Sequence, residues 1–344
     1  MPPILRRVKR AILRLRPEEF ATLLLFVPMA WALARMAAMP RPSVPAGDPT
    51  AGYPDALARL AVLGATAVAI VVVARWNPRW RLLRDSMPFL FAANLYASLH
   101  DLIRFFNAPD ITRWLYRLDV WLFGGEPTVW AERLMNPILT DFFTVCYWLF
   151  YVLPPLLGLL LYLKDERAAF RATMVSVVLC LFAGYVGYVA FPASAPRLAI
   201  PGAYLNPLHG WWLLDYTRSA TRAVPLTAYG AFPSLHCGVM LLSIILAWRY
   251  HRWFFWIQLP FGTGLVLGTV YLRHHWVVDI LAGFALAVFF YWAGPRIERR
   301  WERAARRLAG GLGWPGAEPA AARAATSGAA HATPLPRRRA GAAR

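Results

Sequence analysis

Charged residues are scarce in this 344-residue chain, and lysine is nearly absent. Asp, Glu, Lys and Arg together make up only 16% of the residues, whereas 58% are hydrophobic and 15% are aromatic. A soluble domain carries about 25% charged residues, so the composition argues against a soluble enzyme, a disordered chain or a fibrous repeat. Cysteine is rare too: three scattered residues form neither a disulfide framework nor a metal-ligand spacing. The composition is typical of a membrane protein.

Eight apolar segments approach or reach the roughly 20 residues that cross a bilayer as a helix. We therefore expect an all-α, polytopic membrane protein with about eight transmembrane helices. The first segment carries Arg35 and lacks a small-residue cleavage site, so it is interpreted as a retained span rather than a signal peptide. Pro154 and Pro155 predict a kink in the fourth span. The expected spans are approximately residues 20–39, 57–74, 87–105, 142–163, 172–191, 232–248, 254–271 and 276–293.

The net charge of +19 is distributed unevenly over the connections between these spans. Most of the 37 basic residues fall in the N-terminal arm, in three connections on the same side, and in the C-terminal tail. The positive-inside rule then places both termini in the cytoplasm, most simply at a plasma (inner) membrane. Topology and attraction to anionic lipid account for the charge, so no nucleic-acid partner is expected. Beyond Gly310 the tail has little apolar bulk and is expected to be disordered.

The residues that could perform chemistry collect on the opposite, outward side. His236 begins the sixth span, and His275 follows 39 residues later. This separation equals about two membrane crossings, so both histidines must emerge at the same face. Asp279 follows His275 by four positions, one helical turn away. Arg197, just after the fifth span, reaches that face as well.

This set of side chains suits phosphoryl transfer. His275 can attack phosphorus if Asp279 orients its ring and stabilises the positive charge that forms. His236 can protonate the departing oxygen as a general acid. The guanidinium of Arg197 can hold two phosphate oxygens. Ser234 is placed as a helix N-cap, where free backbone N–H groups point toward an anion.

Taken singly, each residue has a plainer explanation. A histidine at a helix end is more often a capped or interfacial side chain than a catalyst, and a lone Arg197 would be a headgroup anchor. Their joint placement at one membrane face favours a site, because an ionisable residue with a partner inside a membrane protein is a functional candidate. His274 should point away from His275 around a helix, which predicts a spare role. Five tryptophans are interpreted as interfacial belt residues: Trp211, Trp212, Trp253, Trp256 and Trp276.

The motifs around the two histidines resemble those of a known family. Residues 233–236 (PSLH) are similar to the second signature, and residues 275–279 (HWVVD) to the third, of the type 2 phosphatidic acid phosphatase (PAP2) and vanadium haloperoxidase superfamily. The extended stretches 229–236 and 271–283, and the segment 118–127, resemble the branch of the fungal inositol phosphorylceramide synthases. The resemblance implies a six-helix core bundle and a phosphohistidine intermediate. It also implies the same catalytic roles.

The chain departs from the superfamily pattern at its cations. The first signature's Lys corresponds to Ala190, and the third signature's Ser-Arg pair to Gly268 and Thr269. Arg273 is assigned to phosphate binding as a partial replacement. Fewer cations are tolerable for a phosphodiester with one negative charge and less so for a dianionic monoester. This modestly favours transfer between diesters over monoester hydrolysis.

These observations predict three parts of the chain. Residues 1–86 form an N-terminal arm with two extra transmembrane helices, residues 87–294 form a catalytic core, and residues 295–344 form a basic tail. The expected activity is that of a sphingolipid-type inositolphosphotransferase acting on a membrane lipid at the outer face. Three acidic residues of the 101–139 loop are considered as polyol ligands, with solvation as the simpler explanation: Asp101, Asp119 and Glu126.

Two alternatives stay open at this point. The first is a phosphatase for lipid phosphates or polyprenyl diphosphates. The second is a transporter or scaffold that uses the His and Asp side chains as a proton relay, although such a relay is expected nearer the bilayer midplane. No metal or cofactor is required, because the protein itself supplies the positive groups and the nucleophile. The sequence names neither the donor lipid nor the acceptor, and the oligomeric state is unknown.

Overall fold

The computed structural model describes residues 12, 15–39, 55–75, 81–221 and 229–310. Two compact units are distinguished, and the unit of residues 14–301 contains the candidate site. The other unit comprises residues 1–13 and 302–344, of which residue 12 and residues 302–310 are described. The predicted disordered tail beyond Gly310 lies outside the described residues.

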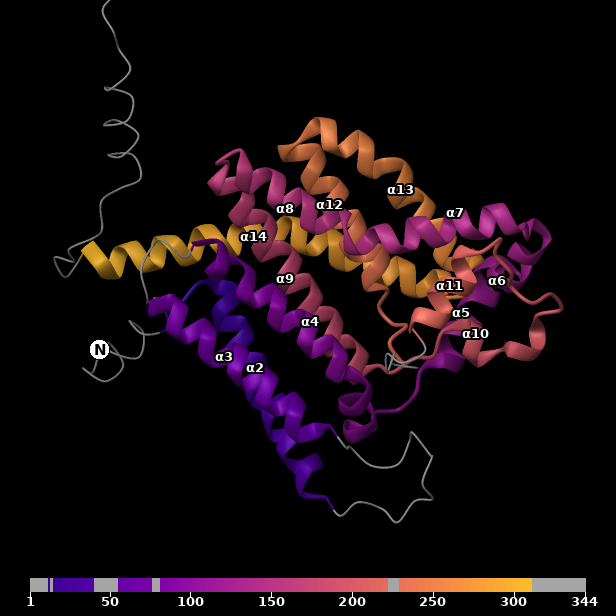
Figure 1. The fold of residues 1–344 in the computed structure, drawn as a ribbon, viewed down its shortest axis with the longest axis horizontal. Coiled ribbons are helices and arrows are strands. Elements are labelled where there is room, and N and C mark those ends of the chain that lie inside the picture. Colours follow the sequence, from indigo (N-terminus) through magenta and orange to yellow (C-terminus); the bar gives the residue numbers. More distant parts are fainter. Residues whose placement is uncertain (1–11, 13–14, 40–54, 76–80, 222–228, 311–344) are drawn as a thin grey trace, which may run out of the picture. The chain divides into compact units, whose positions relative to one another are not determined.

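The described residues are almost entirely helical, as predicted (Figure 1). Among them, β structure is limited to one isolated bridge between Ala193 and Gly230. The longer helices are α2 (Pro17–Ala38), α3 (Ala56–Arg75), α4 (Arg81–Phe106), α5 (Thr112–Phe123), α7 (Pro137–Trp148), α8 (Leu153–Leu163), α9 (Arg167–Ala190), α11 (Leu213–Thr221), α12 (Leu235–Tyr250), α13 (Arg252–Tyr271) and α14 (Val277–Gly310). The short helices are α6 (Pro127–Trp130), η2 (Ala131–Leu134), η3 (Leu149–Tyr151), α10 (Pro196–Ala199) and η4 (Pro201–Ala203).

Each of the eight expected spans coincides with a helix or a bent helix pair, but fewer of them qualify as spans. Five helices among the described residues, α2, α3, α9, α13 and α14, are long and apolar enough to cross a membrane. A sixth span results if α7, η3 and α8 are counted as one. Helix α12 has only 16 residues, and α4 is not among the apolar candidates. The structure thus supports five to six spans.

The kink predicted in the fourth span lies a few residues before the prolines. Helices α7 and α8 are bent by 43° at the short η3 segment. Pro154 and Pro155 follow in the first turn of α8, where the missing N–H groups of proline would have no helical acceptor. The prolines therefore begin a new helix instead of interrupting one.

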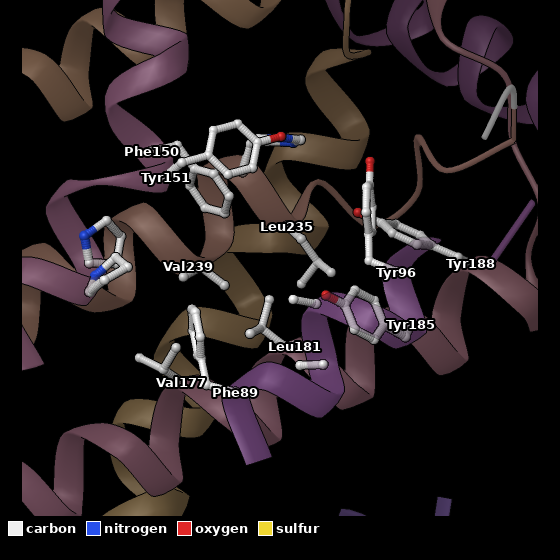
Figure 2. Close-up of a pocket in the computed structure, with 15 residues that line it drawn as sticks. Phe89, Tyr96, Phe150, Tyr151, Val177, Leu181, Tyr185, Tyr188, Leu235 and Val239 are labelled. Atoms are coloured by element: carbon white, nitrogen blue, oxygen red, sulfur yellow. The ribbon is translucent and has the colours of Figure 1, made fainter. Parts of the chain in front are cut away.

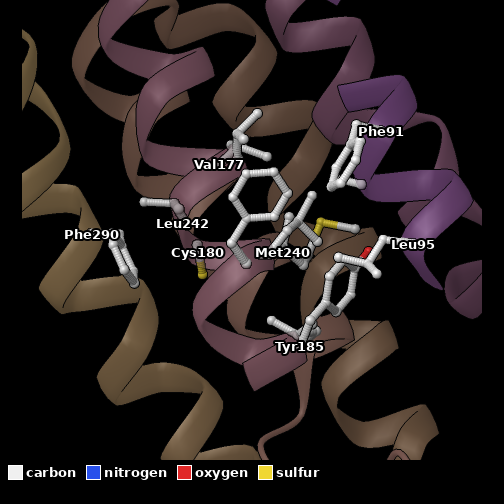
Figure 3. Packing of buried hydrophobic residues seen from close by; sticks show 14 of the residues in the cluster. Phe91, Leu95, Val177, Cys180, Tyr185, Met240, Leu242 and Phe290 are labelled. Carbon is white, nitrogen blue, oxygen red and sulfur yellow. The ribbon is translucent and has the colours of Figure 1, made fainter. Parts of the chain in front are cut away.

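The main hydrophobic core lies where α4, α9, α12 and α14 pack together (Figure 3). Phe91 and Leu95 of α4 face Val177 and Cys180 of α9 and Met240 of α12. Helices α2 and α3 pack on each other and on α4, while α12 and α13 form a helical hairpin whose second helix lies against α7. Because lipid tails are as apolar as these side chains, close van der Waals packing stabilises the arrangement rather than transfer of the side chains out of water.

Two glycines allow α12 and α14 to approach backbone to backbone. A Cβ atom on Gly238 would lie 2.6 Å from the carbonyl oxygen of Gly283, and one on Gly283 would lie 2.2 Å from that of Ser234. The backbone N–H of Ser234 also donates to the carbonyl oxygen of Asp279 at 3.0 Å. This close contact brings the first turns of the two helices that carry His236 and Asp279 together.

An ion-pair network lies at the other ends of α9 and α14. Arg171 of α9 is buried and donates to Glu18 of α2, at 2.5 and 2.9 Å, and to Glu298 of α14, at 2.9 Å. Asp85 of α4 pairs with Arg16 and with Arg167 at 2.6 Å. Four carboxylates thus meet four guanidinium groups, with Glu19 and Arg84 as the remaining pair. The network ties the N-terminal helix to the helices of the core.

The prediction that Trp276 is an interfacial belt residue is wrong. Trp276 is fully buried, its indole N–H donates to the carbonyl oxygen of Ser194 at 2.9 Å, and it packs in a small cluster with Leu115. The other four tryptophans are exposed, as an interfacial position requires. The aromatic pattern could not separate them, because Trp276 is covered by the loops that follow α4 and α9.

Candidate active site

The predicted chemical residues meet at a cavity of about 230 Å³. It lies where α9 gives way to α10, where α12 begins, and where α13 passes into α14. Three of its polar side chains come from the predicted set, Arg197, His236 and His275. The remaining polar and aromatic lining is Tyr96, Thr144, Tyr147, Trp148, Tyr151, Thr217, Arg218 and His274.

The imidazole rings of His236 and His275 lie side by side. Their centroids are 5.8 Å apart, and the rings are inclined at 53°. This proximity follows from the α12–α13 hairpin, whose tight turn near Arg249 returns the chain to the level at which it started. The spacing leaves room for one phosphorus atom within reach of both rings.

Asp279 lies directly behind His275. Nδ1 of His275 is 3.1 Å from Oδ1 of Asp279, within ion-pair distance although not aligned as a hydrogen bond. The other carboxylate oxygen accepts the backbone N–H of Trp276 at 3.1 Å, which fixes the carboxylate at the start of α14. Burial, and then the charge of Arg197, lower the pKa of His275 to about 3. The imidazole is therefore neutral at pH 7, the form in which a ring nitrogen can attack phosphorus.

Arg197 is paired with the other histidine of the HH dipeptide. Its Nη1 contacts Nδ1 of His274, and its backbone N–H donates to the carbonyl oxygen of Arg273 at 3.1 Å. The expectation that His274 points away from the site is wrong, because residues 272–276 are not helical. The backbone N–H groups of His274 and His275 both donate to the carbonyl oxygen of Thr269, at 2.8 and 3.2 Å, which turns both rings toward the cavity.

Tyr147 of α7 is a site residue that the sequence did not indicate. Its ring stacks on His236 with centroids 4.7 Å apart and lies 4.8 Å from His274. One aromatic side chain thus supports two of the three histidines. Tyr147 sits in an aromatic-rich apolar run, where nothing local distinguishes it from its neighbours.

Ser234 occupies the N-cap position expected for it. Its Oγ accepts the backbone N–H of Cys237 at 3.4 Å, and the residue is fully buried. The side chain is therefore used in starting α12, immediately before His236. It is not among the residues that line the cavity.

Arg273 does not line the cavity either. Its Nη2 donates to Glu132 at 3.0 Å and to the carbonyl oxygen of Asn206 at 2.8 Å, and its guanidinium lies 3.8 Å from the centre of the Tyr204 ring. The backbone of Arg273 has a φ of 61°, in the left-handed region, which directs its side chain away from the neighbouring histidines. Its contacts connect the loops around α6 and η4.

The three acidic residues considered as polyol ligands all have structural partners. Asp101 pairs with Arg59 at 2.9 Å. Asp119 is fully buried and accepts the first backbone N–H groups of α14. Glu126 caps α6 and accepts from Thr128, and burial raises the pKa of its carboxyl to about 7. Solvation, the simpler explanation, is wrong for all three, because each carboxylate is buried and is used in a structural contact.

Gly268 and Thr269, which stand where the third signature has its Ser-Arg pair, are tightly packed against their neighbours. A Cβ atom on Gly268 would lie 3.0 Å from Cβ of Phe143, so even a serine would press on α7. Thr269 is fully buried, and its hydroxyl lies 3.5 Å from Sγ of Cys237. A larger side chain at either position would require α13 to move relative to its neighbours.

An apolar cavity of about 200 Å³ adjoins the site (Figure 2). It extends among α4, α8, α9 and α12, and Tyr96, Tyr151 and His236 line it together with the first cavity. Nε2 of His236 is 3.4 Å from the hydroxyl of Tyr151. His236 therefore stands between a polar cavity and an apolar one. Among the described residues, no group of three or more His, Cys, Asp or Glu side chains is arranged to hold a metal ion.

Comparison with known proteins gives one family match. The model of the PAP2 superfamily matches residues 113–293. The chain is 27% identical over 253 residues to a phosphoinositol dihydroceramide synthase of Bacteroides thetaiotaomicron, covering 64% of this chain and 79% of that protein. It is 24% identical over 192 residues to an inositol phosphorylceramide synthase of Candida albicans, covering 47% and 39%. No solved structure matches the chain.

Proposed function

Because this chain belongs to the PAP2 superfamily and is a membrane enzyme of the phosphotransferase or phosphatase type, we propose that it transfers a phosphoinositol headgroup between membrane lipids. The donor is a phosphatidylinositol-type phosphodiester, and the acceptor is the hydroxyl of a ceramide-like lipid. The names of the two similar synthases support this choice of headgroup and acceptor. The catalytic core comprises residues 87–294.

In the first half of the reaction, Nε2 of His275 attacks the phosphorus of the donor. A P–N bond forms and the P–O bond to the diacylglycerol breaks, while His236 gives a proton to the departing oxygen. Asp279, 3.1 Å from Nδ1 of His275, stabilises the positive charge that develops on the ring. Arg197 binds the non-bridging oxygens. The first turn of α12, capped by Ser234, directs backbone N–H groups toward the same anion.

In the second half, the acceptor hydroxyl replaces the diacylglycerol. His236, now without its proton, takes the proton of that hydroxyl, the oxygen attacks phosphorus, and the P–N bond breaks. The products are the phosphoinositol-bearing lipid and the regenerated histidines. Water in place of the lipid hydroxyl would give hydrolysis by the same steps.

The single observation that carries the proposal is the meeting of Arg197, His236 and His275 at one cavity, with Asp279 behind the nucleophile. The adjoining apolar cavity supports a lipid substrate, because it places hydrocarbon-compatible surface next to His236. The charge distribution along the sequence favours cytoplasmic termini and an extracytoplasmic site at the plasma (inner) membrane.

A lipid phosphate or polyprenyl diphosphate phosphatase is the second candidate. A third relative supports it: a PA-phosphatase related-family protein of Dictyostelium discoideum, 26% identical over 102 residues, which cover 29% of this chain and 18% of that protein. The same four side chains would perform that reaction with water as the acceptor. The limited coverage makes this the weaker of the two.

The test is an assay of purified protein in lipid–detergent micelles. Phosphatidylinositol labelled in the inositol is incubated with and without ceramide or diacylglycerol, beside phosphatidic acid as an alternative substrate. A new inositol-containing lipid that depends on ceramide and disappears in His275→Ala supports the transferase. Free phosphate from phosphatidic acid, without such a lipid, selects the phosphatase. Activity on neither substrate contradicts both.

A further inference from the structure

The cavity contains a second guanidinium group that none of the family signatures supplies. Arg218 of α11 lines it together with Arg197 and the three histidines. Its Nη1 donates to the carbonyl oxygen of Leu208 at 3.0 Å, and Asp215 lies 3.8 Å away at the exposed surface. The Arg218 side chain is 49% exposed, so it stands at the mouth of the cavity, where an incoming ligand would meet it.

Helix α11 is held in place by Asp141 of α7. One carboxylate accepts four successive backbone N–H groups at the start of α11, those of Trp211, Trp212, Leu213 and Leu214, at 3.0–3.1 Å. Such capping satisfies donors that a helix start otherwise leaves without partners. The position of Arg218 is thus set by a specific contact between two distant segments.

One face of α11 is turned toward the cavity. Leu214, Thr217 and Arg218 all line it, and residues three and four positions apart lie on the same side of a helix. Leu214 is also buried in a cluster with Leu208 and Leu272, which anchors this face beside the HH dipeptide. Arg218 therefore lies at the cavity on the same face of α11 that packs on Leu208 and Leu272.

The charged side chains that line the cavity are all basic, with Asp279 behind His275 and Asp215 beside Arg218 outside the lining. Its lining contains two arginines and three histidines, and no carboxylate occurs among the described residues that form it. Burial, and then the positive charge of Arg197, lower the pKa of His274, so this ring is neutral. Because Nδ1 of His274 accepts from Arg197, the proton of the neutral ring lies on Nε2, which leaves an N–H donor. Such a lining favours an anion with several acceptor oxygens.

We propose that Arg218 and Arg197 together bind the phosphate oxygens of the donor lipid, so that Arg218 replaces the signature cations missing at Ala190 and Thr269. This inference rests on the proposed function for the identity of the lipid, but the phosphate chemistry is shared by both candidate reactions. With two arginines at the cavity, the missing signature cations no longer favour a diester over a monoester. The preference for a diester then depends on the similar synthases alone.

The experiment compares Arg218→Gln and Arg218→Lys with a matched control, Arg117→Gln, which changes an exposed arginine of α5 away from the cavity. The KM for phosphatidylinositol is expected to rise about 10-fold or more in Arg218→Gln, because losing a hydrogen bond between charged groups weakens binding by about that factor. Arg218→Lys should recover part of the loss. The KM for ceramide and the yield of folded protein should not change.

A second measurement does not depend on turnover. Stabilisation of each full-length variant by inorganic phosphate is followed by thermal unfolding, since a ligand raises the stability of the state that binds it. The apparent affinity should fall about 10-fold in Arg218→Gln and stay unchanged in Arg117→Gln. If no phosphoinositol lipid forms but this difference persists, the transferase proposal fails and the anion site stands. Equal phosphate affinity and equal donor KM in Arg218→Gln and Arg117→Gln would overturn the anion site.

Discussion

Asp119 of α5 holds the beginning of α14, 158 residues further along the chain. Its Oδ2 accepts the backbone N–H of Val277 at 2.7 Å, and its Oδ1 accepts that of Val278 at 2.9 Å. The carboxylate is fully buried. Val277 lies between the proposed nucleophile His275 and its partner Asp279, so Asp119 fixes the backbone that joins the two and does not line the cavity itself.

Replacing Asp119 by Ala should therefore reduce turnover as well as stability. Loss of an N-cap costs about 1–2 kcal/mol, and the freed N–H groups would be buried without acceptors. Asp119→Asn keeps one acceptor oxygen and should recover part of kcat, whereas the KM for the donor should change little in either variant. Turnover and thermal unfolding of both variants provide the measurement. A loss of stability with unchanged kcat in the surviving fraction would leave Asp119 a purely structural residue.

The proposed covalent intermediate should be trapped when no acceptor is present. Phosphatidylinositol labelled in its phosphate should transfer the label to wild-type protein in an acid-labile form, and His275→Ala should remain unlabelled. Asp279→Asn should lower turnover by on the order of 10²–10⁴-fold, because the nucleophile loses the group that orients it. His209→Ala, at an exposed histidine in the connection between η4 and α11, is the matched control. Labelling of His275→Ala at the wild-type level would assign the nucleophile elsewhere.

The acid limb of kcat/KM should lie well below pH 6.5. Burial and Arg197 lower the pKa of His275 to about 3, so the ring stays neutral when the pH falls from 7 to 5. Asp279, His236 and His274 are the other titratable groups beside it. In Arg197→Gln the removed positive charge no longer opposes protonation, and the acid limb of the residual activity should move to higher pH. Phosphatidylinositol is the substrate of choice, because its phosphodiester does not titrate in this range.

An acid limb of kcat/KM near pH 6.5 in the wild type would contradict the assignment of His275 as a buried nucleophile that is neutral at this pH. A shift to lower pH in Arg197→Gln would contradict the electrostatic role given to Arg197. Arg117→Gln, whose charge lies away from the cavity, should leave the profile unchanged.

Tyr147 should act through its ring and not through its hydroxyl. It packs on His236 and His274, with ring centroids 4.7 and 4.8 Å away. Tyr147→Phe should keep most of the activity, whereas Tyr147→Ala should lose on the order of 100-fold in kcat, since both imidazoles lose their support and small displacements of reacting groups are costly. Tyr216→Ala, at an exposed ring of α11, is the control. Equal losses in the Phe and Ala variants would indicate a role for the hydroxyl.

Stability should depend strongly on the ion-pair network at the far ends of α9 and α14. Arg171→Gln removes the buried guanidinium that pairs with Glu18 and with Glu298, and it should cost about 3–5 kcal/mol. Arg306→Gln breaks an exposed pair with Glu302 and should cost no more than about 0.5 kcal/mol. Thermal unfolding in detergent distinguishes them. Initial rates of the two variants at low temperature should be similar, because the ion-pair network lies at the ends of α9 and α14 that are far from the histidines. Equal unfolding midpoints for Arg171→Gln and Arg306→Gln would contradict the stabilising role of the network.

Local sequence patterns determined most of the helices of this protein and the relative position of two of its histidines. Apolar runs located the longer helices of the described residues except α5 and α11. Ser234 was identified as the N-cap of α12, and the interval between His236 and His275 placed both rings at one end of a helical hairpin. These predictions succeeded because helical periodicity, capping and span length act over a few residues or at a fixed rise per residue.

Only the tertiary structure decided how the irregular connections complete the site. It turned Arg273 toward Glu132 and His274 into the cavity, buried Trp276, and brought Arg218 to the mouth. None of these positions follows from periodicity, because the segments concerned are short, non-helical or held by distant partners such as Asp119 and Asp141. Contacts between residues far apart in the chain fix such segments, and a single sequence does not record which distant groups will meet.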